Sequence, residues 1–251
     1  MIFRRRDKSD DSIQQAIEKA AGKPVDEPGE PSGGPDPQDP GSPRVRSTPD
    51  NDDDAALASV RSRGPWDADE VDIDEDDPSH IDLGGLIVKG IAGLELQLQT
   101  DEQSGQIVSI MFVTEESGLE LRAFASSRGK GLWDDVRREL GAEATRMGGT
   151  ATKVEGPYGD ELRVMLPVQT PDGQSATQPS RVVGIEGPRW LLRATFLGKA
   201  ALEPDDDGLL EAALRDVVVV RGSQAMPPRE QIPLRLPPGA EALTHTEPED
   251  G

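Results

Sequence analysis

The sequence predicts an α+β fold, in which a mostly antiparallel sheet is flanked by two helices. Three observations lead to this prediction. Short apolar runs separated by Gly-rich turns fill most of residues 81–222, a spacing typical of β-hairpins. Apolar residues recur at helical spacing in only two widely separated places there. Finally, the 251 residues are 34% hydrophobic, and these residues concentrate between about 83 and 236, which is enough for one core of common domain size.

Three antiparallel strands and a helix are predicted first. Residues alternate between apolar and polar from Leu94 onward, as in a half-buried strand. The turns "SGQ" and "SG" then introduce two further strands, "IVSIMFVTEE" and "LELRAFASS". In "GLWDDVRRELGAEATRMGG", Leu132, Val136 and Leu140 share one side of a helix, and the final glycines end it.

Two hairpins, a second helix and a last strand follow. "TATKVEGPYGDELRVMLPVQT" predicts a hairpin with Gly159 and Asp160 in the turn, and "RVVGIEGPRWLLRATFLG" predicts another that turns at Glu186–Pro188. Residues 205–216 form the second helix, with acidic residues at its start, where the helix dipole favours them. The run "VVVVRG" predicts a strand buried on both faces. The expected order is therefore βββ-α-ββ-ββ-α-β.

The two ends of the chain have compositions that cannot form a core. Residues 9–21 are a short helical candidate, either a fraying helix on a tail or a helix that docks on a partner or a membrane surface. Five regions are expected in order. A disordered tail with that helix (1–62) is followed by an acidic Trp-bearing arm (63–80) and the α+β domain (81–222). A Pro-rich extended segment (223–239) and a second disordered tail (240–251) complete the chain.

Charge and cysteine content limit the classes of protein to which this chain is expected to belong. The formal net charge is −21, most of it outside the core, and such a field disfavours nucleic acid and anionic membrane surfaces as partners. The chain has no cysteine and no run of about 20 apolar residues that would span a membrane. Its basic start, "MIFRRRDKSDD", lacks the apolar segment of a secretory signal. We therefore expect a cytoplasmic protein that does not bind nucleic acid.

One of the three tryptophans lies where little can be buried. Trp133 at a helix start and Trp190 at a strand start are expected in the core, since a large aromatic side chain buries much surface. Trp66 instead lies in "RGPWDADEVDIDEDDPSH", among acidic residues. Two hypotheses give it a role, and a third is that it is a spectator. Either Pro65, Trp66 and Asp67 fix the acidic arm onto the domain of the same chain, or Trp66 anchors a protein partner, where tryptophan is a frequent hot spot.

Three arginines near the second hairpin form a further candidate interaction site. Arg181, Arg189 and Arg193 are spaced so that strand alternation could give a small basic face. Alternatively, the same side chains could pair with the acidic arm, which would reinforce its docking.

Signatures of catalysis or cofactor binding are missing from the sequence. The two histidines, His80 and His245, lie in segments expected to be flexible, and the sequence has no nucleotide-binding loop or nucleophile elbow. The acidic run from Asp72 resembles a calcium loop, but Asp77 stands where glycine is required and Leu83 where glutamate is required. We predict no catalytic residue, no cofactor and no metal site.

Several motifs in combination resemble an actinobacterial family of domains of unknown function. They are "RGPWD", "DLGGLIV", "AFASSRGKGLWDDVRREL", "EGPYGDELRVMLPV", "TQPSRVVGIEGPRWLLRATFLG" and "MPPREQIPLRLP". The resemblance covers about residues 63–237 and implies cytoplasmic character, with no activity or catalytic residue to carry over. The segment "WLLRATFLG", followed by a helix and "VVVV", is also similar to the end of Mog1/PsbP-like sandwiches, which are largely binding folds. That is a likeness of fold alone.

Together these features predict a non-enzymatic protein-interaction or adaptor module, whose acidic arm modulates a binding surface. The alternative is a small-ligand binder or enzyme that uses carboxylates and arginines in a cleft, which predicts converging acidic side chains with perturbed pKa values. A third hypothesis is an acidic decoy for basic proteins, whose affinity would collapse with salt.

Overall fold

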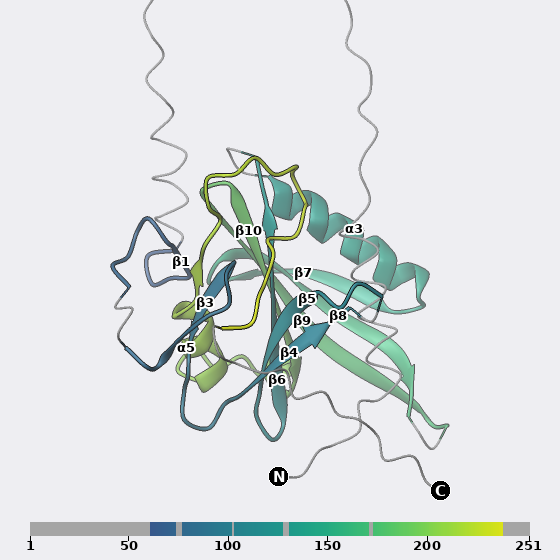
Figure 1. Ribbon diagram of the computed structural model, residues 1–251. Helices are drawn as coiled ribbons and strands as arrows, with labels where there is room; N and C mark the ends of the chain where they lie inside the picture. Colours follow the sequence, from purple (N-terminus) through teal and green to yellow (C-terminus); the bar gives the residue numbers. More distant parts are fainter. Residues whose placement is uncertain (1–60, 74–76, 102, 128–130, 171–172, 238–251) are drawn as a thin grey trace, which may run out of the picture.

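The computed structural model describes residues 61–73, 77–101, 103–127, 131–170 and 173–237 (Figure 1). The helix expected over 9–21, most of the linker after it and the tail after 239 lie outside the described residues. Within them, the structure confirms the predicted class: an α+β fold with a mostly antiparallel sheet.

The main sheet has seven antiparallel strands, in the spatial order β4-β5-β6-β10-β9-β8-β7. The predicted three-stranded meander forms β4, β5 and β6, and the two predicted hairpins form β7–β8 and β9–β10. The bounds of these strands are Glu95–Thr100 (β4), Ile107–Val113 (β5), Ser117–Ala125 (β6), Thr150–Gly156 (β7), Gly159–Gln169 (β8), Ser175–Gly187 (β9) and Trp190–Gly198 (β10).

A second, smaller sheet was not predicted. Its four strands have the order β1-β11-β3-β2, and β1 runs parallel to β11. The apolar run "VVVVRG" supplies only two residues to β11, whereas β1 comes from the acidic arm. The bounds are Trp66–Asp67 (β1), His80–Asp82 (β2), Leu86–Lys89 (β3) and Val218–Val219 (β11).

Helices cover opposite faces of the main sheet (Figure 1). Helix α3 (Leu132–Arg146) packs on one face, against β7, β8 and β9. The single-turn α4 (Lys199–Leu202), which was not predicted, and α5 (Leu209–Arg215) lie on the other face with the small sheet. Successive residues of β9 show this division: Gly184 meets Trp133 of α3, whereas Val183 and Ile185 pack in the cluster that contains α5.

Both predicted hairpin turns are displaced from their predicted positions. The first loop is Pro157–Tyr158 rather than Gly159–Asp160, because Gly159 already pairs with Gly156 as the first residue of β8. The second loop is Pro188–Arg189 rather than Glu186–Pro188. Gly187 stays in the strand opposite Trp190, where a Cβ would lie 2.1 Å from the indole ring. This glycine therefore makes room for an aromatic ring and does not form the turn.

Each tryptophan ring lies against a glycine. Trp133 and Trp190 are buried in the core as predicted. A Cβ on Gly184 would lie 2.0 Å from the Trp133 ring, and a Cβ on Gly64 would lie 2.8 Å from the Trp66 indole nitrogen. The glycine that lies against the Trp133 ring is thus Gly184, 51 positions further along the chain, and not the nearby Gly131.

Candidate interaction surface

The arm is joined to the domain by backbone pairing with β11. The N–H of Trp66 donates to the carbonyl of Val217 at 2.8 Å, and the N–H of Ala68 donates to that of Val219 at 3.1 Å. The Trp66 side chain is half-buried. In the described part of the arm, therefore, Trp66 docks on its own chain.

Buried polar contacts also hold this segment. The indole Nε1 of Trp190 donates to Asp67 Oδ2 at 2.6 Å. Arg61, 1% exposed, lies over the Trp190 ring at 5.0 Å and donates to the Pro65 carbonyl at 3.0 Å. We call Arg61, Asp67, Glu70 and Trp190 the arm anchor.

The last contact of the arm anchor is an ion pair. Arg61 donates to both carboxylate oxygens of Glu70 at 2.8 Å, and the Asp67 N–H donates to one of them. Burial raises the pKa of Glu70, but the Arg61 hydrogen bonds, the Asp67 N–H and the Arg61 charge together hold that pKa below its usual value. Sequence reasoning missed Arg61 and Glu70. Their only signal was the presence of arginines before "GPWD" and of acidic residues after it.

The three arginines predicted to form a basic face do not share one. Arg181 lies opposite Phe196 in the β9–β10 pair, whereas Arg193 lies opposite Gly184. Because the partners 193 and 196 are an odd number of residues apart on β10, the two guanidinium groups point to opposite faces of the sheet. Arg189 occupies the turn with φ 60° and donates to the Gly222 carbonyl at 3.3 Å. The prediction of a basic face was therefore wrong.

Arg181 instead belongs to a buried group on the α5 side of the sheet. It donates to Glu211 of α5, lies 3.7 Å from Glu161 and stacks over Phe196 at 3.8 Å. Burial raises the pKa of Glu211, although the Arg181 charge and hydrogen bond oppose that rise. We call Arg181, Glu161 and Glu211 the α5 cluster. It attaches α5 to the sheet.

Arg193 lies on the α3 side, with its guanidinium 5.4 Å from the Phe124 ring centre. Arg122 donates to Glu120 at 2.9 Å on the same face. All of these charged side chains are buried. The alternative prediction, in which these arginines pair with the arm, is not met by Arg181, which pairs with Glu161 and Glu211, while Glu70 of the arm pairs with Arg61.

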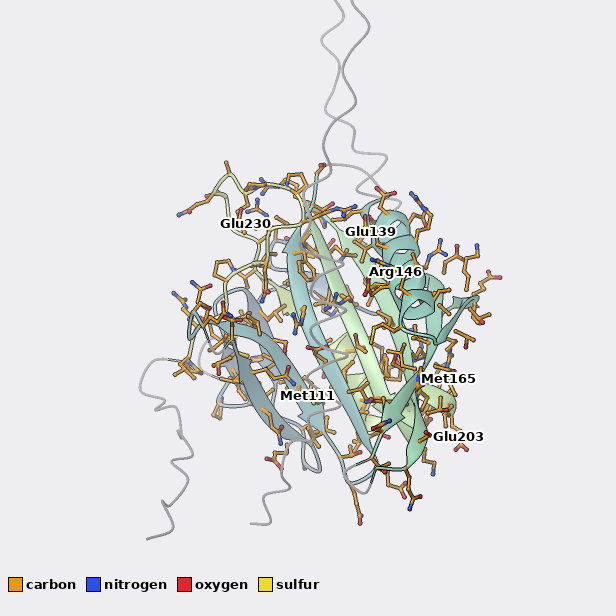
Figure 2. The ribbon with its side chains drawn as sticks, turned by 90° about the vertical axis from the view of Figure 1, so that its right-hand side faces the viewer. Met111, Glu139, Arg146, Met165, Glu203 and Glu230 are labelled. Carbon is orange, nitrogen blue, oxygen red and sulfur yellow. The ribbon has the colours of Figure 1, made fainter. Side chains whose placement is uncertain are left out.

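An open hollow of about 380 Å³ lies between α4 and the β7–β9 part of the sheet. Three apolar side chains on its lining are exposed: Val154 (37%), Met165 (38%) and Leu202 (60%). Figure 2 shows Met165 and Glu203, the residue after Leu202, on the same side of the molecule. Arg163 is the one ionisable residue of the described lining, and it donates to Glu161 at 2.8 Å and to the Ala201 carbonyl at 2.7 Å.

Other kinds of site are missing from the described part of the chain. Nowhere in it do three His, Asp or Glu side chains gather as metal ligands would. None of the helices in these same ranges is both long and apolar enough to cross a membrane.

Comparison with curated protein sequences gave no match. Among solved structures, the chain is similar to the solution structure of cyanobacterial PsbP (CyanoP) from Synechocystis. The identity is 10% and the TM-score 0.33, over 59% of this chain and 98% of that one. A family model, "Protein of unknown function (DUF3710)", matches residues 64–242, which begin beside the arm anchor and include both sheets. The chain therefore belongs to the DUF3710 family.

Proposed function

We propose that this domain binds another protein through the hollow beside α4. The observation that carries the proposal is the gathering of exposed apolar side chains. Val154, Met165 and Leu202 all line the hollow, and Leu209 is the one other large hydrophobic residue with comparable exposure in the described ranges. Apolar side chains clustered at a concave surface are typical of a protein contact site.

The chemistry of the hollow favours contact over reaction. The alternative function, a ligand binder or enzyme, requires acidic side chains that converge in a cleft. The acidic residues with a described ionic role near the hollow, Glu161 and Glu211, are buried against Arg181 and are not on its lining. Apolar residues, with one arginine already engaged, are better suited to hold an apolar anchor of a partner.

Charge from the arm reaches the β7–β8 hairpin, which also lines the hollow. Tyr158 lies in the loop of this hairpin, and burial and the Glu211 charge raise its pKa to about 12, while the charges of Arg215 and of Arg63 in the arm oppose that rise. The same hairpin carries Val154 and Met165. We propose that the acidic arm modulates binding at this surface.

A matched pair of substitutions tests the proposal. Leu202→Glu places a charge on the hollow, whereas Leu209→Glu places one on a residue that is similarly exposed (46%) but lies outside it. With the full-length chain as bait, quantitative mass spectrometry should show at least about a tenfold loss of the captured partner for Leu202→Glu, the effect expected at a hot spot. Leu209→Glu should capture as much as the wild type.

One outcome would contradict the proposal, and a salt series would then test the acidic decoy hypothesis. If Leu202→Glu captures the same proteins as the wild type, the hollow is not the contact surface. If capture is unaffected by Leu202→Glu but collapses as salt is raised, the acidic decoy hypothesis explains binding better. Thermal unfolding of both variants is the control for folding, and little change is expected because both side chains are exposed.

A further inference from the structure

The β7 end of the main sheet is open. β7 bonds to β8 on one side and is the last strand in the sheet order. Residues 152–155 of this strand are all exposed. An exposed edge strand presents unpaired backbone N–H and C=O groups, which can pair with another strand.

The charges on β7 are arranged unevenly. Lys153 and Glu155 lie two residues apart and so point to the same face of the sheet. Lys153 Nζ lies 2.8 Å from Asp160 Oδ2, and Arg137 lies 3.4 Å from the same atom. Glu155 lies directly opposite Asp160 in the β7–β8 pair, and in the described residues it makes no ion pair. Facing like charges are unfavourable. Lys153 and Arg137 offset the charge of Asp160, whereas in the described residues Glu155 has no such cation.

We infer that β7 pairs antiparallel with β7 of a second copy of this chain, so that Lys153 of each copy lies opposite Glu155 of the other. Cross-strand neighbours have Cβ atoms about 5 Å apart, within reach of an ion pair. In this register Val154 lies opposite Val154 of the partner on the other face. Each Glu155 thereby gains the cation that its own chain gives to Asp160.

Charge selects this register over its neighbours. An edge-to-edge antiparallel pair that continues the sheet keeps each face continuous, so the register changes only in steps of two residues. One step in one direction places Lys153 opposite Lys153, and one step in the other places Glu155 opposite Glu155. The strand is thus complementary in charge to itself, which favours a second copy over an unrelated strand as the occupant.

The pairing would also bring two hollows together. Val154 lies at the two-fold axis of the proposed pair and also lines the hollow. The hollows of the two copies would therefore approach one another across the axis, on the face that carries α4. A partner with two apolar anchors could then engage both.

Charge-swap variants of the full-length chain test the inference. Sedimentation equilibrium at moderate salt should give a dimer for the wild type. Lys153→Glu and Glu155→Lys should each weaken the dimer by roughly tenfold or more, because both opposite-charge pairs become like-charge pairs. The Lys153→Glu/Glu155→Lys double variant should dimerise again. An equimolar mixture of the two single variants should form a heterodimer, because only the mixture restores both pairs.

A wild type that stays monomeric at about 100 µM, a concentration high enough to reveal a weak dimer, would overturn the inference. So would a double variant or a mixture no more associated than the single variants. The inference does not rest on the proposed function. Leu202→Glu should remove the partner and leave the dimer, whereas Lys153→Glu should weaken the dimer and leave the apolar lining of the hollow in place.

Discussion

The arm anchor and the α5 cluster each attach a short segment to the main sheet through a buried arginine, but burial acts on them differently. In the α5 cluster the carboxylates of Glu161 and Glu211 are almost fully buried, and burial raises the pKa of Glu211 despite Arg181. In the arm anchor Glu70 is partly exposed, and Arg61 and the Asp67 N–H hold its pKa below its usual value.

The difference shows when a charge pair stabilises a fold. Removing a carboxylate from water costs free energy that its partner must offset. Glu70 keeps part of its hydration, so its bonds to Arg61 are a net gain. Glu211 loses almost all of its hydration, so Arg181 offsets only part of the cost. The α5 cluster therefore determines where α5 lies more than it adds to the free energy of unfolding.

The largest effect is expected from Arg181→Met, which leaves both acids of the α5 cluster without this cation. The free energy of unfolding at pH 7 should fall by about 3–5 kcal/mol, as for other buried pairs that lose one partner. The pKa of Glu211 is already raised and should rise further in the variant. A raised pKa gives stability that is present at low pH and is lost as pH rises, so the deficit should shrink between pH 7 and pH 5. Urea denaturation at both pH values measures this.

A double variant provides the control for that experiment. Arg181→Met/Glu211→Leu removes both charges of the closest pair and should recover most of the lost stability, because apolar replacements of a buried pair are often neutral or better. If the double variant were as unstable as Arg181→Met, the loss would come from packing around Phe196 and not from the uncompensated acid.

A smaller effect is expected from Asp67→Ala in the arm anchor. The substitution leaves the Trp190 N–H buried without its acceptor, which should cost about 2 kcal/mol. It should also free the arm, so trypsin should cut after Arg61 and Arg63 faster than in the wild type. Asp69→Ala is the matched control, since Asp69 is exposed. Equal digestion of the two variants would show that Asp67 does not hold the arm.

The sequence was sufficient to predict the strands and hairpins of the main sheet, which are local along the chain, but it did not predict the pairing of β6 with β10. β4, β5 and β6 alternate and turn at glycines, and each pairs with its neighbour in sequence. The small sheet could not be predicted in the same way. β1 and β11 have two residues each, and Trp66 pairs with Val218 across most of the domain. No local periodicity signals such a long-range parallel pair.

The candidate site was predictable only in part, for a similar reason. Pattern placed Pro65, Trp66 and Asp67 in one motif, but the partner of Asp67 is Trp190, 123 residues later. Strand alternation also suggested that Arg181 and Arg193 share a face, because a three-residue turn at Glu186–Pro188 would place them opposite each other, whereas the observed loop has the two residues Pro188–Arg189. Changing the length of a hairpin loop by one residue reverses the face assigned to each residue beyond it, because directly opposite residues share a face.

The smallest effect is expected from Glu70→Gln, which removes the charge of the arm anchor but keeps an acceptor for Arg61. Because Glu70 is partly exposed, the loss at pH 7 should be under about 1 kcal/mol. The pKa of Glu70 is lowered on folding, so its contribution is present above the unfolded pKa and is lost as pH falls through the folded pKa. Urea denaturation should therefore show a deficit at pH 7 that shrinks toward pH 4. The deficit of Arg181→Met should also shrink on acidification, but from a larger value and because burial raises the pKa of Glu211. A Glu70→Gln deficit that grew as pH fell would mean that burial, and not Arg61, controls Glu70 as well.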